Sequence, residues 1–182
     1  KKPDPIKDPT VPTTPESAVA DMIKAMADAK AALATRNVIS AKSHLTVAMS
    51  LAKAPDHQAM AKRLETLTHY VSEFWKGVVD GINGLEGVDE LEVGPLRVRV
   101  VEFGPGSITI RAEGRNLRYT TDDIPSGLAE VLFERVRDMK DPINKITKGA
   151  FHSVDKNRTV DSARRMFQEA QLSGGDVADV LA

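Results

Sequence analysis

Alternating apolar and polar positions dominate the middle of the chain and predict short β-strands there. Successive segments place an apolar residue at every second position, with mostly charged or polar residues between. The alternating apolar residues are Leu91, Val93, Leu96, Val98, Val100, Ile108, Ile110, Ala112, Leu117 and Tyr119. Hairpin-type turns separate the segments at Gly94-Pro95, Gly104-Pro105-Gly106 and Gly114-Arg115-Asn116. The pattern therefore predicts a four-stranded antiparallel meander over residues 87–124, with one buried face.

Helical periodicity occupies the chain on both sides of this meander, over residues 16–86 and 125–182. In the first region, Asn37 and Ala54-Pro55 interrupt the apolar stripes and divide the region into three helices. The residues predicted to begin helices in the second region are Asp123, Asp141, Thr159 and, for a last short helix, Asp176. Because four short strands make little core alone, we expect the sheet to curl into an SH3-like barrel or to lie against a helix. The predicted fold class is α+β: a helical N-terminal part, the SH3-like meander and a helical C-terminal part.

The first fifteen residues have no apolar periodicity and contain five prolines. Such a segment disfavours helix and sheet, so residues 1–15 are predicted to form a disordered, extended tether. Tethers of this kind often follow a signal peptide or a membrane anchor, which favours a periplasmic or envelope-associated protein after removal of a signal segment. A linker within a longer cytoplasmic protein is the alternative.

Composition excludes several classes of function. A formal net charge of −1 argues against a general polyanion binder, and the absence of cysteine excludes disulfides and thiolate sites. No apolar run approaches the roughly 20 residues of a membrane helix, so no transmembrane segment is predicted in this chain. The glycines match neither phosphate-loop nor dinucleotide spacing, and no serine lies in a nucleophile elbow. The sequence therefore predicts no catalytic residue and no cofactor.

Small residues in the first two predicted helices resemble those of tetratricopeptide-type helix pairs. The residues with this spacing are Ala29, Ala41, Leu45 and Ala48, and part of it recurs at Ala163, Phe167 and Ala170. The arrangement of the whole chain resembles an uncharacterised planctomycete-type bacterial protein family. The features that carry this resemblance are the Phe74-Trp75 helix end, the arginine-rich meander and the Asp-Ile-Pro-x-Gly-Leu-Ala turn at 123–129. The resemblance implies architecture only. Ordinary helical hairpins that use alanine for close packing are the alternative.

Glu65, His69 and Glu73 stand four residues apart on one face of the third predicted helix. Carboxylates and imidazole at this spacing bind divalent metals, which would make the protein a metal-dependent hydrolase or lyase. A solvated polar face opposite the apolar stripe explains the same residues.

Arginines crowd the meander and are the predicted partner-binding residues. They are Arg97, Arg99, Arg111, Arg115 and Arg118, expected together on the outer face. Guanidinium groups pair with carboxylates or phosphates. Nucleic acid fits less well than an acidic protein partner, because only Phe103 and Tyr119 could stack on bases and Tyr119 shares its face with buried residues. Cross-strand ion pairs that keep the sheet soluble are the alternative role.

From these patterns we expect a non-catalytic protein-interaction or scaffold module in the cell envelope. A metal-dependent enzyme and a nucleic-acid-binding module are the two other hypotheses.

Overall fold

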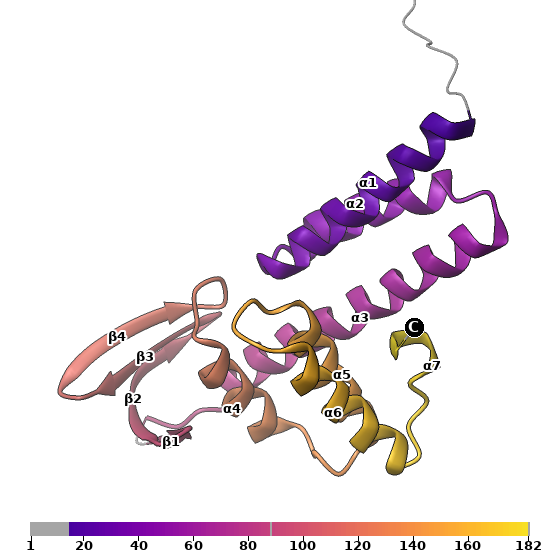
Figure 1. Ribbon diagram of the computed structural model, residues 1–182. Helices are drawn as coiled ribbons and strands as arrows, with labels where there is room; N and C mark the ends of the chain where they lie inside the picture. The colour runs from indigo at the N-terminus through magenta and orange to yellow at the C-terminus, as the bar shows by residue number, and fades with distance from the viewer. Residues whose placement is uncertain (1–14, 88, 182) are drawn as a thin grey trace, which may run out of the picture.

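The computed structural model describes residues 15–87 and 89–181, which form a set of helices with one antiparallel sheet at one end of the molecule (Figure 1). The helices are α1 (Pro15–Ala34), α2 (Val38–Leu51), α3 (Pro55–Asn83), α4 (Ser126–Val136), α5 (Pro142–Val154), α6 (Val160–Leu172) and α7 (Ala178–Leu181). The strands are β1 (Glu90–Val93), β2 (Leu96–Gly104), β3 (Ser107–Ala112) and β4 (Arg115–Thr120). The predicted α+β fold class is confirmed. The predicted tether falls, apart from Pro15, outside the described residues.

α1 and α2 form an antiparallel hairpin whose turn and interface both follow from the sequence. Asn37, where the sequence predicts a break between two helices, accepts a hydrogen bond from the Ser40 amide and caps α2. Arg36 completes the turn in the left-handed region, at φ 65°. Ala29 and Ala41 are fully buried where the two helices meet, so the helix axes approach closely.

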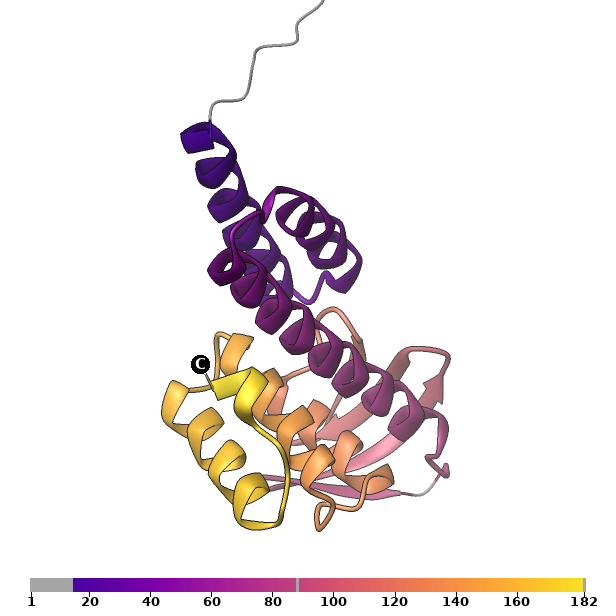
Figure 2. The ribbon, with the colours of Figure 1, turned by 90° about the vertical axis from the view of Figure 1, so that its right-hand side faces the viewer.

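α3 runs from this hairpin into the C-terminal half of the molecule (Figure 2). Pro55 occupies its first turn, where a missing N–H costs nothing. The helix continues to Asn83, past the glycines at 77 and 81. Those glycines lie against α4: a Cβ on Gly81 would stand 2.2 Å from the Leu132 carbonyl oxygen. They therefore serve the packing of two helices rather than marking a weak helix end.

The strands pair in the order β1-β2-β3-β4, so β1 and β4 are both edge strands. The sheet thus lies open against helices, and its likeness to an SH3 barrel is not established. Its apolar face packs on the end of α3 and on α4 in one cluster. The fully buried members from the sheet and the two helices include Val98, Val100, Ile108, Val78, Ile82, Leu128 and Leu132.

The β3–β4 turn lies earlier than the sequence predicts. The turn residues are Glu113 and Gly114, with φ of 50° and 79°, instead of residues 114–116. A two-residue turn with positive φ at both positions matches the twist of the strands it joins. β4 consequently begins at Arg115, and Asn116 is a strand residue.

Caps fix the starts of the C-terminal helices. Asp141 and Thr159 cap α5 and α6, as predicted, by accepting hydrogen bonds from Ile143 and Ser162 amides. The predicted cap at Asp123 is wrong, because α4 starts after Pro125 without a side-chain cap. Asp123 instead accepts bonds from the Thr120 amide (2.6 Å) and hydroxyl (2.9 Å), which lower the pKa of its carboxyl.

Stacked aromatic rings join the two halves of the molecule. Phe74 is fully buried, with its ring 3.9 Å from that of Phe151 and 4.9 Å from that of Phe133. Trp75 is half-buried and meets Phe151 edge-on. The Arg36 guanidinium from the α1–α2 turn lies over its ring at 4.8 Å. None of the described helices is both long and apolar enough to cross a bilayer.

Candidate functional site

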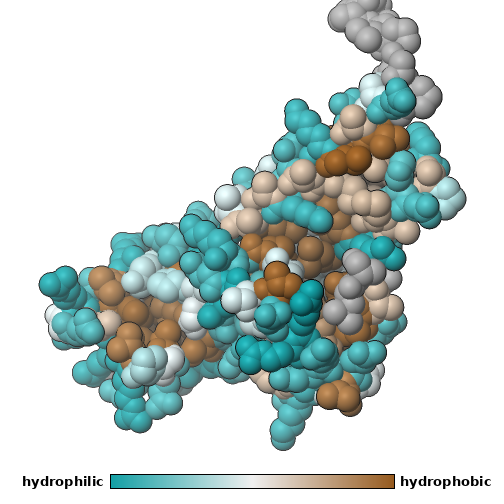
Figure 3. Space-filling view, in the orientation of Figure 1, coloured by the Kyte–Doolittle hydropathy of each residue, from teal (hydrophilic) through white to brown (hydrophobic). Residues whose placement is uncertain are grey.

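Four of the five predicted partner-binding arginines share the face of the sheet that points away from the helices. Their strand positions alternate with the buried apolar residues, and all four are exposed. We call this set, Arg97, Arg99, Arg111 and Arg118, the arginine face. The exposed surface in Figure 3 is mostly hydrophilic with scattered apolar patches.

The register sets two arginines directly against each other. Arg99 on β2 is the Cα partner of Arg111 on β3. Side chains at such positions are about 5 Å apart at Cβ, and like charges there are destabilising. Glu90 is the partner of Arg99 on the other side, yet no ion pair forms between them among the described residues.

Most of the arginine face lacks a carboxylate partner. Arg97 pairs with Glu92 at 2.9 Å, and both side chains are more than two-thirds exposed. Arg111 donates to the amide oxygen of Asn116 at 2.9 Å. Within the described part of the chain, Arg99 and Arg118 have no ion pair or side-chain hydrogen bond. Three guanidinium groups on one small surface are therefore free of carboxylates.

Arg115 does not belong to this face, contrary to the sequence prediction. It is the Cα partner of Ala112, which shares the helix-side face with Ile108 and Ile110. The cause is the early turn: starting β4 at residue 115 gives Arg115 the same orientation as Leu117 and Tyr119.

Glu65, His69 and Glu73 lie along α3 but do not converge. Glu65 pairs with Lys62 at 2.6 Å, and Glu73 pairs with Lys76 at 3.8 Å. The His69 ring rests against Tyr70. Among the described residues, no group of three or more histidine, aspartate or glutamate side chains is placed to hold a metal ion. Lysine partners on α3 itself account for both carboxylates.

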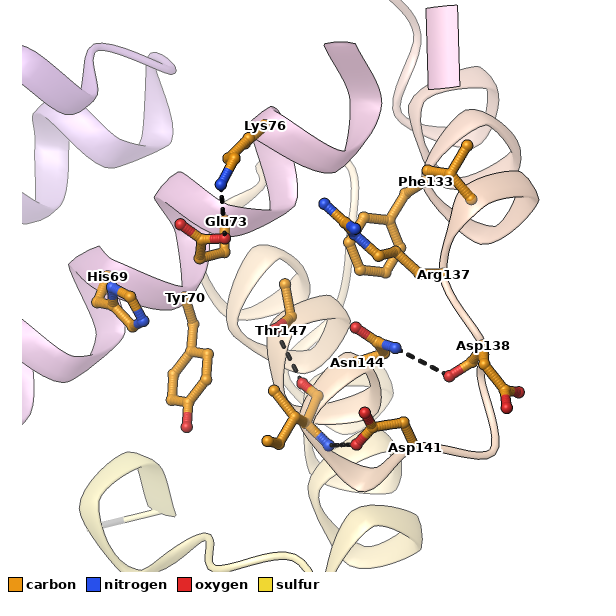
Figure 4. Close-up of a pocket in the computed structure, with 12 residues that line it drawn as sticks. His69, Tyr70, Glu73, Lys76, Phe133, Arg137, Asp138, Asp141, Asn144 and Thr147 are labelled. Carbon is orange, nitrogen blue, oxygen red and sulfur yellow. Dashed lines mark hydrogen bonds and ion pairs between the residues drawn. The ribbon is translucent and has the colours of Figure 1, made fainter. Parts of the chain in front are cut away.

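A polar hollow of about 680 Å³ lies between α3 and the start of α5 (Figure 4). His69 and Glu73 line one wall, whereas Arg137 and Asn144 line the other. Its polar groups are largely engaged with neighbours: Arg137 pairs with Asp80 at 2.8 Å, and Asn144 donates to the Asp138 carbonyl at 2.9 Å. Charges of both signs alternate around the hollow, so its lining favours neither an anionic nor a cationic ligand.

Sequence reasoning missed a half-buried charge cluster beneath α4. The Glu130 carboxylate meets Lys148 at 3.2 Å and His152 at 3.1 Å, and it also contacts Arg158. Neither the His152 nor the Arg158 contact with Glu130 Oε1 has hydrogen-bond alignment. His152 also meets the Ser162 hydroxyl at 3.0 Å. With Glu130 only 13% exposed, this cluster ties α4, α5 and the loop before α6 together.

A second missed group surrounds Asp155. Its carboxylate accepts hydrogen bonds from the Ser126 hydroxyl at 2.9 and 3.0 Å and from the Asn157 amide at 2.8 Å. Arg36 approaches the same carboxylate at 3.9 Å and donates to the Thr121 carbonyl at 3.3 Å. In these contacts Ser126 has a carboxylate partner but no histidine, so it does not form a nucleophile triad. The Asp155 group instead links the start of α4 to the loops at Arg36 and Asn157.

Comparison with protein-family models, curated proteins and solved structures finds no match to this chain. The resemblances to tetratricopeptide-type helix pairs and to a planctomycete-type family therefore stay predictions.

Proposed function

We propose that this protein is a non-catalytic interaction module that binds an acidic segment of a partner protein through the arginine face. The observation that carries the proposal is the register, which sets Arg99 against Arg111 while leaving both without a carboxylate. Opposed like charges cost stability, and a ligand that brings carboxylates between them removes that cost. Arginine favours such ligands because its planar guanidinium binds a carboxylate through two hydrogen bonds.

An acidic protein segment suits this face better than nucleic acid does. Readers of single-stranded nucleic acid present aromatic rings on which bases stack. Here Phe103 and Tyr119 lie on the helix-side face, opposite the arginines, and both are half-buried. The arginine face thus supplies charge and directional hydrogen bonds without a stacking surface.

Replacing Arg97, Arg99, Arg111 and Arg118 together by glutamine tests the proposal. The exposed Arg97–Glu92 pair contributes only about 0–1 kcal/mol, and relief of the Arg99–Arg111 repulsion offsets this, so we expect the free energy of unfolding to change by less than about 1 kcal/mol. Binding of an octaglutamate peptide, measured by calorimetry at low salt, should be lost.

A matched control makes the same charge change at exposed positions away from the sheet. Its four substituted residues are Lys24, Lys42, Arg63 and Arg165, each changed to glutamine. This variant should bind the peptide like the parent protein. Equally weakened peptide binding in both variants would show that binding depends on net charge and not on the arginine face. Tighter binding of octathymidylate than of octaglutamate would favour the nucleic-acid hypothesis.

A further inference from the structure

β4 exposes a hydrogen-bonding edge as well as an arginine-bearing face. It pairs only with β3, through a two-residue turn at Glu113-Gly114. In a hairpin of this type the residues that flank the turn exchange both backbone hydrogen bonds, and such pairs then recur at every second position. Residues 115, 117 and 119 therefore bond toward β3, which leaves the backbone N–H and C=O groups of residues 116, 118 and 120 pointing outward.

Part of this edge is already occupied, and part is free. The Thr120 amide donates to Asp123, and its carbonyl accepts from the amides of Asp123 and Ile124. In the described part of the chain, no such partner meets the outward backbone groups of Asn116 or Arg118, and both residues are exposed. A strand laid beside them would form up to four backbone hydrogen bonds before Asp123 stops it.

The side chains along this edge are basic on one face and apolar on the other. Arg118 lies on the outer face, opposite Thr109 and diagonal to Arg111 on β3. On the helix-side face, the row Val100–Ile110 continues into Leu117. Val100 and Ile110 are buried, whereas Leu117 is 38% exposed. The apolar row is thus uncovered at its last member, where a further strand would cover it.

β1 shows which kind of strand suits an edge with this pattern. Its sequence, Glu-Leu-Glu-Val, alternates acidic and apolar residues. Glu92 pairs with Arg97 on the outer face, while Leu91 packs opposite Val98 on the buried face. Leu91 and Val98 are both 3% exposed, so the apolar side chains of this strand pair are fully covered.

We propose that β4 binds an extended segment of a partner protein, in which acidic and apolar residues alternate, as a fifth strand of the sheet. This inference rests on the proposed function and specifies its ligand. The outward groups of Asn116 and Arg118 would bond to the segment's backbone, as in other cases of strand addition. Its acidic residues would lie beside Arg118, with Arg111 one strand further into the sheet, and its apolar residues would cover Leu117.

A second copy of the chain fits this edge less well. Pairing of β4 with β4 would bring two arginine rows together, with like charges opposed. Addition of β1 from one copy to β4 of another would match the charges, but this head-to-tail contact leaves the same edge free on the next copy. Repeated, it produces a filament instead of a closed oligomer.

Asn116→Pro tests strand addition on the intact protein. Proline removes the outward N–H of residue 116 without removing a hydrogen bond to β3, and an edge strand tolerates it at such a position. Asn116→Ala is the matched control, because it removes the side-chain contact with Arg111 but keeps the N–H. The probe is a peptide that repeats Glu-Leu-Glu-Val twice, compared with a peptide of the same composition whose glutamates are grouped at one end.

We expect the alternating peptide to bind more tightly than the grouped one, and Asn116→Pro to weaken it about tenfold relative to Asn116→Ala. Amide hydrogen exchange at Asn116 and Arg118 of the parent protein should slow in the complex. This measurement keeps the test decisive if the proline variant fails to fold.

Equal binding of the two peptides, without amide protection, would overturn strand addition and leave the octaglutamate result as the test of the arginine face. Failure of both peptides to bind would also overturn strand addition. Growth of assemblies with protein concentration, slowed by the alternating peptide, would assign the edge to a second copy and overturn a partner segment.

Discussion

Glu130 is the residue on which Lys148, His152 and Arg158 converge, so its ionisation governs the charge balance beneath α4. Burial raises the pKa of its carboxyl, but these three neighbours lower it by more, and the pKa lies below its ordinary value of 4.5. A group whose pKa is lowered on folding stabilises the native state above its unfolded pKa, and that stability is lost as pH falls through the folded pKa. The contribution of Glu130 is therefore present at neutral pH and lost on acidification below 4.5.

Glu130→Gln should lower the free energy of unfolding by about 2 kcal/mol or more at pH 7, because it leaves half-buried cations without their carboxylate. The difference from the parent protein should shrink as pH falls below 4.5, which urea titrations over a pH series would measure. Glu134→Gln is the control: Glu134 also contacts Lys148, but its side chain is 40% exposed, so its loss should cost less than about 1 kcal/mol. A variant with the parent's stability at pH 7 would contradict the role given to Glu130.

Residue roles were predictable from the sequence where the partner lies within a few positions. Asn37, Asp141 and Thr159 cap helices by bonding amides two or three residues ahead. Arg36 was not predictable, because Thr121 and Asp155 reach it only through the tertiary fold, 85 residues away for Thr121. Nothing in the local sequence distinguishes such an arginine from one on a solvated turn.

At the scale of elements, contact between α3 and α4 depends on Gly81, a glycine in the last turn of α3. Glycine in a helix costs up to about 1 kcal/mol relative to alanine, so its presence needs a compensating reason. For Gly81 that reason is the Leu132 backbone, which lies where a Cβ would be. The sequence shows the glycines but not what they contact, so their packing role could not be predicted from it.

Gly81→Ala should destabilise the protein by about 1–3 kcal/mol, despite its better helix propensity, because α4 must move away from α3. Gly87→Ala, where nothing lies within 4 Å of the added Cβ, should change stability by less than about 0.5 kcal/mol. Thermal unfolding of both variants measures the difference. A Gly81→Ala protein more stable than the parent would show that the two helices separate without cost.

The strands were predicted well, and the arginine face only in part, for one physical reason. A period of two assigns each side chain to a face once the register is known, but a turn misplaced by one residue reverses the assignment. Gly114 fits either placement, since both need a positive φ there. Because the turn was expected at 114–116, the first residues of β4 were not recognised as strand residues. Arg115 was consequently assigned to the wrong face, and the outward backbone N–H of Asn116 was not foreseen.

At the scale of the whole molecule, α3 contributes to two apolar clusters and couples them. One cluster contains the sheet, α4 and the C-terminal part of α3, and the other contains α1, α2 and its N-terminal part. Helical periodicity predicted α3, but not that it spans both halves, because its apolar stripe is the same whichever elements cover it. Trp75 packs against both clusters, and its neighbour Phe74 stacks on Phe133 and Phe151 within the sheet cluster.

Phe74→Ala should destabilise both halves together, by about 3–5 kcal/mol, because loss of this fully buried ring leaves a cavity in the sheet cluster against Trp75, which packs on both clusters. Native-state hydrogen exchange would then accelerate by similar factors in α2 and in α4, since one global opening exposes both. Phe103→Ala is the control, because this half-buried ring packs at the sheet: it should speed exchange in β2 and β3 with a smaller effect on α2. If Phe74→Ala left the exchange of α2 unchanged while that of α4 rose, the helical hairpin would be an independent unit and α3 would connect the halves without coupling them.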